Sequence, residues 1–213
     1  MMKRVLFFLA VIMAFLLLSS DCAYARKIAF TFDDGPSPLY TKRLLKILAV
    51  HLAKATFFVK GENAERYPEI LRAEFYAGHE IGNHAYSHPR LTEIGKESVR
   101  RQIEMTQNAV FEVIHIWPKY FRPPYSAKNS IVEDVVKSLD LKMARWEVSP
   151  EDYKCEPPEI IAKKVLSAIR PGMKRIVVVM HDNCPHTPEA VDIILGDLEK
   201  MGFEFVTLSD LEK

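Results

Sequence analysis

The sequence predicts an α/β domain built on a parallel β-sheet of about seven strands. Short runs of β-branched and aromatic residues alternate with amphipathic segments, which is typical of parallel strands joined by helices. The run Ile176–Met180 is entirely apolar, as expected for a strand covered on both faces. Histidines, carboxylates and an arginine follow several of these runs, at the strand ends where α/β folds place their functional sites. The pattern allows either a small barrel or an open doubly wound sheet.

The expected strands, in chain order, are Ile28–Phe32, Thr56–Val59, Glu80–Asn83, Tyr120–Arg122, Leu141–Trp146, Ile176–Met180 and Phe203–Thr207. Apolar residues at helical spacing predict helices within Tyr40–Lys54 and Glu93–Ile114. A third helix is expected to begin with Thr187 as its N-cap and Pro188 in its first helical position. No repeat or linker interrupts residues 26–213, which are therefore expected to form a single domain.

The segment Met1–Ala25 differs from the rest of the chain. Lys3 and Arg4 precede an unbroken apolar run from Val5 to Leu18, and Ala23-Tyr24-Ala25 follows it. A charged start, a short apolar stretch and small residues at the exit are typical of a secretory signal peptide. The run is shorter than the ~20 residues that cross a bilayer, and an uncleaved anchor is the alternative. We expect cleavage after Ala25, a secreted or periplasmic location and no membrane span in the mature chain.

Composition excludes several classes of protein. Lys plus Arg number 29 against 28 for Asp plus Glu, and 48% of residues are hydrophobic. This balance argues against a disordered chain and against nucleic acid as a partner, and we expect a monomer. Glycine-rich phosphate-binding loops are absent from the sequence. Beyond Ala25 only Cys155 and Cys184 remain; they could form one disulfide or stay separate thiols.

The first polar motif, Thr31-Phe32-Asp33-Asp34-Gly35-Pro36, follows the first expected strand. Side chains alternate in direction along an extended chain, so the adjacent carboxylates of Asp33 and Asp34 can serve different roles. The alternative is an ordinary Asp-Gly turn.

The second motif contains His84 and His88, four residues apart, directly after the third expected strand. Two such histidines reach the same metal if the chain makes one helical turn between them. Taken alone, the pair is more often two unrelated surface or core histidines. With Asp34, however, they would supply three protein ligands and leave open positions, as catalytic metal sites require.

Three further motifs end strands. Arg122 precedes Pro123-Pro124-Tyr125 and could orient a carboxylate bidentately, the alternative being a rigid proline turn with a surface arginine. An aromatic and acidic stretch runs from Trp146 to Tyr153, although Trp146 could equally be a core residue. His181 ends the most apolar strand, a position that favours an acid–base function.

Together these five motifs, in this order, resemble those of the polysaccharide deacetylase family, which includes chitin, chitooligosaccharide, peptidoglycan and acetylxylan deacetylases. The resemblance spans Thr31 to His181 and covers essentially all of residues 26–213, which it implies to be one catalytic domain with a distorted (β/α) barrel of about seven parallel strands. It implies a hydrolase that removes N-acetyl or O-acetyl groups from an acetylated polysaccharide or oligosaccharide.

The resemblance also implies roles. The metal ligands would be Asp34, His84 and His88, holding Zn²⁺ or another divalent metal such as Co²⁺ or Ni²⁺. Asp33 would be the general base and His181 the general acid. Supporting roles would fall to Arg122, which holds Asp33, to Asp152, which keeps His181 charged, and to the backbone N–H of Tyr125, which stabilises the oxyanion; Trp146, Tyr153 and Tyr125 would contact the sugar.

Departures from the family pattern occur at Ala85, Ser126, Ser149 and Tyr153, and none of them falls on a proposed ligand, base or acid. Two rival readings remain open at this point. One is a catalytically inactive glycan-binding protein of the same fold. The other is a non-haem iron oxygenase, which also uses two histidines and one carboxylate. The sequence does not identify the glycan, nor does it decide between amide and ester.

Overall fold

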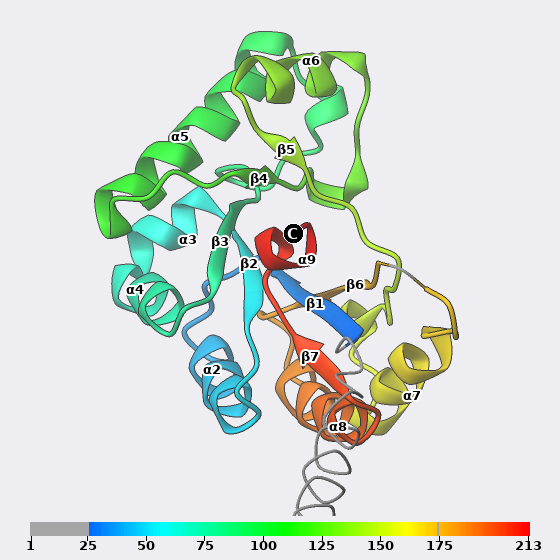
Figure 1. Ribbon diagram of the computed structural model, residues 1–213. Helices are drawn as coiled ribbons and strands as arrows, with labels where there is room; N and C mark the ends of the chain where they lie inside the picture. Colours follow the sequence, from blue (N-terminus) through cyan, green and yellow to red (C-terminus); the bar gives the residue numbers. More distant parts are fainter. Residues whose placement is uncertain (1–25, 174) are drawn as a thin grey trace, which may run out of the picture.

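The computed structural model describes residues 26–173 and 175–213 (Figure 1). The expected signal peptide and its cleavage after Ala25 lie outside the described residues. The described chain contains seven parallel strands, β1 (Arg26–Asp33), β2 (Ala55–Val59), β3 (Glu80–Asn83), β4 (Tyr120–Phe121), β5 (Lys142–Met143), β6 (Val177–His181) and β7 (Phe203–Phe205). The predicted α/β fold with a parallel sheet is confirmed.

The sheet has the order β5-β4-β3-β2-β1-β6, and β7 pairs with the beginning of β1. It curls into a half-barrel rather than lying flat (Figure 1). One isolated parallel bridge, from Val148 to Val178, connects the segment after β5 to β6. The expected strand Leu141–Trp146 is therefore reduced to the two residues of β5, because the chain leaves β4 at this point and crosses to β6.

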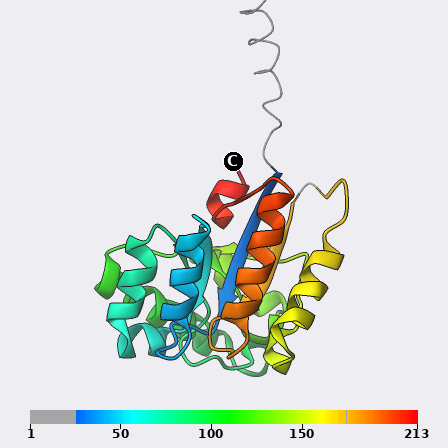
Figure 2. The same cartoon turned by 90° about the horizontal axis from the view of Figure 1, so that it is seen from below.

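Helices connect the strands, and all of them except the last, α9, lie on the outer side of the sheet (Figure 1). They are α2 (Thr41–Val50), α3 (Gly61–Arg66), α4 (Pro68–Tyr76), α5 (Lys96–Ile114), α6 (Ser130–Ser138), α7 (Pro158–Ala168), α8 (Thr187–Lys200) and α9 (Leu208–Leu211), with short 3₁₀ turns η1 (Leu91–Glu93), η2 (Pro124–Ser126) and η3 (Asp152–Lys154). Figure 2 shows α2, α8 and α7 side by side. None of the helices in the described part of the chain has the length and apolar content needed to cross a membrane.

The helix predictions are confirmed for α2 and α5, but the start of α8 differs. His186 is the N-cap of α8, and Thr187 is already helical. The hydroxyl of Thr187 donates a hydrogen bond to Asp152 Oδ2 at 2.6 Å instead of capping the helix. Thr187, which was expected to cap the start of α8, therefore bonds instead to the segment that follows β5.

Alternation along β1 separates the core from the site. Ile28, Phe30 and Phe32 are fully buried in the cluster that includes apolar residues of α2 and α8. Thr31 and Asp33 lie on the opposite face, inside the half-barrel, and both contact Arg122. The period of two thus directs an apolar row outward to the helices and a polar pair inward. Helix α9 packs over the amino-terminal end of the sheet, where the Leu208 N–H donates to Thr56 Oγ1.

Candidate active site

The polar motifs converge at the carboxyl ends of the strands. Asp33 ends β1, His84 follows β3, Arg122 follows β4 and His181 ends β6. A cavity of about 600 Å³ is lined there by Asp33, Asp34, His84, His88, Arg90, Pro123, Tyr125, Ser126, Trp146, Ser149, Tyr153, Val179 and His181. Arg122 lies behind the wall of this cavity. The sheet therefore brings together every side chain that the sequence marked for metal binding and for acid–base chemistry.

Asp34, His84 and His88 form a candidate metal site. Asp34 Oδ1 lies 3.6 Å from His84 Nε2 and 3.2 Å from His88 Nε2, and one ligand atom of each residue lies within 4.8 Å of the others. Burial, with His84 and Lys60 close by, holds the pKa of His88 below its ordinary value despite the nearby carboxylate of Asp34. A neutral imidazole is the form that binds a metal.

The two histidines do not sit on a helical turn, which corrects the expectation from their spacing. The segment from His84 to His88 is irregular, and both Ala85 and His88 have positive φ, at 61° and 59°. His84 Nδ1 lies 2.7 Å from the carbonyl oxygen of Arg122. If Nδ1 donates its hydrogen to that carbonyl, Nε2 carries no hydrogen, and its lone pair is available on the side of Asp34.

The loop that carries the histidines is held by two residues that sequence reasoning missed. Asn83 Oδ1 accepts the N–H of Ala85 at 3.0 Å. Gln102 Oε1 accepts the N–H groups of Tyr86 and Ser87 at 3.0 and 2.9 Å. Asn83 is the first residue of the motif, although no role was predicted for it, whereas Gln102 is on α5 and only the fold brings it to the loop. These bonds hold the loop although Ala85 itself offers no polar side chain.

The side chains of Asp33 and Asp34 point in different directions, but not because they alternate along one strand. Asp33 is the last residue of β1, whereas Asp34 has φ of 76° and has already left the strand. A residue of α3 holds the backbone of Asp34, because the Asp34 carbonyl accepts a hydrogen bond from Asn63 Nδ2 at 2.9 Å. Gly35 follows, and a Cβ at that position would lie 2.1 Å from Asp182 Oδ2, so only glycine fits the turn. Backbone strain of this kind concentrates at functional sites.

Asp33 forms a buried ion pair with Arg122. Arg122 Nη1 donates to Asp33 Oδ1 at 2.7 Å and to Thr31 Oγ1 at 2.8 Å, and the Arg122 side chain is fully buried. The expected bidentate contact is not made, since only one guanidinium nitrogen of Arg122 reaches the carboxylate of Asp33. Burial raises the pKa of Asp33, but the charges of Arg122, His84 and His181 together hold that pKa below its ordinary value. Asp33 is therefore ionised.

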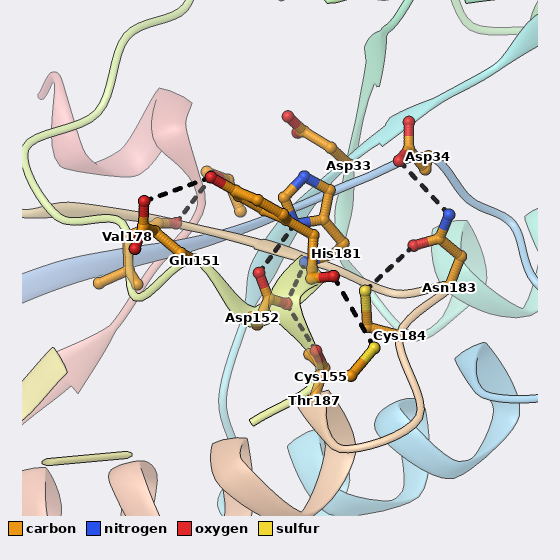
Figure 3. Close-up of polar contacts among 12 residues, drawn as sticks. Asp33, Asp34, Glu151, Asp152, Cys155, Val178, His181, Asn183, Cys184 and Thr187 are labelled. Carbon is orange, nitrogen blue, oxygen red and sulfur yellow. Dashed lines mark hydrogen bonds and ion pairs between the residues drawn. The ribbon is translucent and has the colours of Figure 1, made fainter. Parts of the chain in front are cut away.

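His181 is held by Asp152 (Figure 3). Asp152 Oδ1 lies 2.8 Å from His181 Nδ1, and Asp152 Oδ2 accepts the His181 backbone N–H at 2.7 Å. Burial lowers the pKa of His181, but the bond to Asp152 and the charges of Asp152, Asp33 and Asp34 raise it to about 9. The imidazole is therefore protonated at neutral pH, and Thr187 completes the bonding of Asp152.

Three aromatic side chains edge the cavity. The ring of Tyr125 contacts His88 edge-on, with centroids 4.6 Å apart, and the ring of Tyr153 contacts His181 in the same manner at 5.6 Å. Trp146 lines the cavity while also facing the guanidinium of Arg122 at 5.2 Å. Tyr125 and Tyr153 are more than half exposed, and the guanidinium of Arg90 lies over the Tyr125 ring, 4.8 Å from its centroid.

The two cysteines are free thiols, Cys155 exposed and Cys184 buried. Both lie beside the Asp152–His181 pair (Figure 3). Burial raises the pKa of the Cys184 thiol to about 12. The ligand atoms of Asp152, His181 and Cys184 also lie close together, but Asp152 and His181 are bonded to each other, whereas Asp34 Oδ1 has no hydrogen-bond partner in the described part of the chain; the Asp34 cluster is therefore the candidate metal centre.

Residues 20–144 match the family model described as polysaccharide deacetylase. The peptidoglycan-N-acetylglucosamine deacetylase PgdA of Listeria monocytogenes is 39% identical over 186 residues, which cover 87% of this chain and 39% of the relative. A chitooligosaccharide deacetylase of Azorhizobium caulinodans is 36% identical over 170 residues, covering 79% of this chain and 80% of the relative. This chain therefore spans about two fifths of the Listeria protein and most of the Azorhizobium one.

Solved structures agree with these sequence relatives. The structure of peptidoglycan deacetylase PdaC from Bacillus subtilis has a TM-score of 0.82 to this chain at 34% identity, and the match covers 88% of this chain and 90% of that one. Because the match covers nearly all of both chains, the distorted barrel that the motifs implied is confirmed.

Proposed function

The chain belongs to the polysaccharide deacetylase family, and we propose that it is a metal-dependent hydrolase that removes N-acetyl groups from peptidoglycan glycan strands or chitooligosaccharides. The observation that carries the proposal is the placement of an ionised carboxylate, Asp33, and a protonated imidazole, His181, in the same cavity as the Asp34 cluster. Hydrolysis of an amide needs both a group that takes a proton and a group that gives one.

The residues of the Asp34 cluster fit a divalent cation. Asp34 Oδ1 is buried and has no hydrogen-bond partner in the described part of the chain, although it lies between two imidazole nitrogens. One carboxylate and two imidazoles suit zinc and also Co²⁺ or Ni²⁺; we propose zinc. A bound cation would supply Lewis acidity, polarising the acetyl carbonyl and making water a better nucleophile.

Asp33 is proposed as the general base. Its Oδ2 lies 3.8 Å from His84 Nε2, so it borders the cation site without being held in it, and Arg122 keeps it ionised and fixed on the other side. In that position it takes a proton from the water whose oxygen attacks the acetyl carbon. The oxyanion that develops on the carbonyl is assigned to the backbone N–H of Tyr125 together with the cation site.

His181 is proposed as the general acid. With Nδ1 bonded to Asp152, its Nε2–H remains to protonate the leaving nitrogen as the carbon–nitrogen bond breaks. The products are acetate and a free amine on the sugar, and the proton taken by Asp33 balances the one given by His181. Trp146 and Tyr153 are proposed to receive the faces of the sugar ring.

The two rival functions are less well supported. A glycan-binding protein without activity needs neither a base nor an acid, yet the carboxylate of Asp33 and the imidazole of His181 are both oriented by buried partners. An iron oxygenase would use the same ligand types, but the acid–base pair beside the cluster serves hydrolysis. We further propose that the protein acts in the periplasm or outside the cell, as the sequence pattern of Met1–Ala25 suggests.

The test is acetate release from a panel of acetylated glycans: chitooligosaccharides, peptidoglycan strands and acetylated xylan. Each is assayed after chelator treatment and again after zinc, cobalt or nickel is added back. We expect release from an N-acetylated glycan, its loss with chelator and its recovery with metal. Turnover of none of the substrates by the metal-loaded protein, or full turnover by the chelated protein, would contradict the proposal.

A further inference from the structure

A second hollow lies beside the cavity of the candidate active site. Its volume is about 230 Å³, and it is formed by the segments that follow β4 and β5. Pro123, Ser126 and Trp146 line both hollows, so the two are adjacent. The second hollow is therefore a candidate place for the neighbouring sugar of a linear glycan that presents one sugar to Asp33 and His181.

The ionisable residues that line the second hollow are both cationic, Lys128 and Arg145. Arg145 is exposed, and within residues 26–173 and 175–213 its guanidinium forms no ion pair or side-chain hydrogen bond. Arg175, by contrast, is paired with Glu147 at 2.7 Å. Lys128 Nζ lies 3.5 Å from Glu133 Oε1, an exposed and therefore weak pair. The hollow thus offers one free guanidinium and one loosely held ammonium.

We infer that this hollow, the basic subsite of Ser126, Lys128 and Arg145, binds a sugar that carries a carboxylate, next to the sugar that loses its acetyl group. The inference rests on the proposed function. A guanidinium recognises a carboxylate through two parallel hydrogen bonds. In peptidoglycan every second sugar carries a lactyl group, whose carboxylate is free where no peptide is attached. A uronic acid also carries a carboxylate, whereas chitooligosaccharides carry none. The basic subsite therefore favours an anionic glycan over a neutral one.

The test compares glycans with and without a carboxylate charge. The free acid of an amidase-treated peptidoglycan tetrasaccharide is assayed beside its methyl ester, chitotetraose and an N-acetylated oligosaccharide containing a uronic acid. Arg145→Gln is expected to raise KM for the lactyl acid about twofold to tenfold, with kcat unchanged. KM for the ester and for chitotetraose should not move. A rise with the uronic acid as well would identify the carboxylate itself as the recognised group; a rise with the lactyl acid alone would restrict the subsite to peptidoglycan.

Arg72→Gln, an exposed arginine on α4 outside both hollows, is the matched control and should leave all four KM values unchanged. Lys128→Gln should act in the same direction as Arg145→Gln but more weakly. Equal effects of Arg145→Gln on charged and neutral glycans, or no effect on any, would overturn the inference.

Equilibrium binding separates this inference from the proposed function. The same glycans are titrated into wild-type protein and Arg145→Gln in the presence of chelator, which suppresses turnover. Tighter binding of the free acid than of the ester, lost in Arg145→Gln, supports the basic subsite even if no acetate is released. Equal binding of acid and ester by the wild-type protein contradicts the subsite while leaving deacetylation untouched.

Discussion

Asp152 contacts His181 through both of its oxygens, one to the ring Nδ1 at 2.8 Å and the other to the backbone N–H at 2.7 Å. The carboxylate therefore fixes the position of the ring and its charge at once. Because Asp152 is almost fully buried, its electrostatic effect on the ring is screened little by water. This pair explains why the pKa of His181 is raised to about 9 although burial alone would lower it.

Asp152→Asn should therefore move the alkaline limb of the pH–rate profile to lower pH. Without the carboxylate charge the pKa of His181 falls toward its ordinary value, and less of the imidazolium remains above neutrality. Activity at about pH 8 is expected to drop on the order of 10- to 100-fold, within the range that general acids contribute. Glu151→Gln is the control, because Glu151 is the sequence neighbour of Asp152 but pairs with Lys154 instead of His181. An unchanged alkaline limb in Asp152→Asn would remove His181 from the role of acid.

Arg122→Leu should destabilise the protein in a pH-dependent way. It leaves the carboxylate of Asp33 buried without its cation, which costs about 3–5 kcal/mol for a broken buried pair. Burial then raises the pKa of Asp33, so the loss is larger at alkaline pH, where the group is forced to ionise, than at acid pH. Denaturant unfolding at several pH values measures this.

The double variant Arg122→Leu with Asp33→Asn should regain part of the lost free energy of unfolding, since no unpaired charge remains. Single and double variants of equal stability at alkaline pH would show that the ion pair is not what Arg122 contributes. The double variant also separates stability from activity, because it lacks the proposed base.

His51 should make the free energy of unfolding depend on pH, independently of the active site. It lies between two carboxylates of α8, with Nε2 at 2.9 Å from Asp192 Oδ1 and Nδ1 at 3.0 Å from Glu199 Oε1. Burial lowers the pKa of His51, but the two carboxylates hold it above its ordinary value. A raised histidine pKa stabilises the fold fully below the pKa of the unfolded state, about 6.5, and this stabilisation is lost as the pH rises through the folded pKa.

His51→Gln should accordingly lower the free energy of unfolding by roughly 1 kcal/mol at about pH 5.5, and by much less at about pH 9. Urea unfolding at the two pH values measures the difference. Acetate release should stay at the wild-type level, since His51 lies at the amino-terminal end of the sheet, close to Lys27 and Phe203. A loss of the same size at both pH values would show that His51 stabilises by packing alone.

The sequence predicted the strands well where neighbouring strands bury both faces. β3 matches its expected range residue for residue, and the apolar run of β6 lies within one residue of its expected bounds. The predicted strand bounds were wrong where tertiary contacts override the local sequence pattern. The stretch after Leu141 looks like one strand, but only its first residues pair with β4, and Val148 pairs with β6.

The same limit applies within the site. The types and order of residues predicted that Asp33, Asp34, His84, His88 and His181 belong to one site, and the fold brings all five to one cavity. Asp34 and His88 both have positive φ, and the backbone beside them is held by residues distant in the sequence: Asn63 bonds the Asp34 carbonyl, and Gln102 bonds the N–H groups of Tyr86 and Ser87. Thr187 looked like a helix cap because Pro188 follows it, and only the fold reveals that its hydroxyl bonds to Asp152.

Metal analysis of purified variants, paired with acetate release, tests the division of labour between the two adjacent aspartates most directly. Wild-type protein and Asp33→Asn should retain a divalent cation, and Asp33→Asn should release no acetate. His84→Ala should lose both the cation and the activity, while His115→Ala, an exposed histidine at the end of α5, should lose neither. Loss of metal from Asp33→Asn, or full activity in metal-free wild-type protein, would contradict the account.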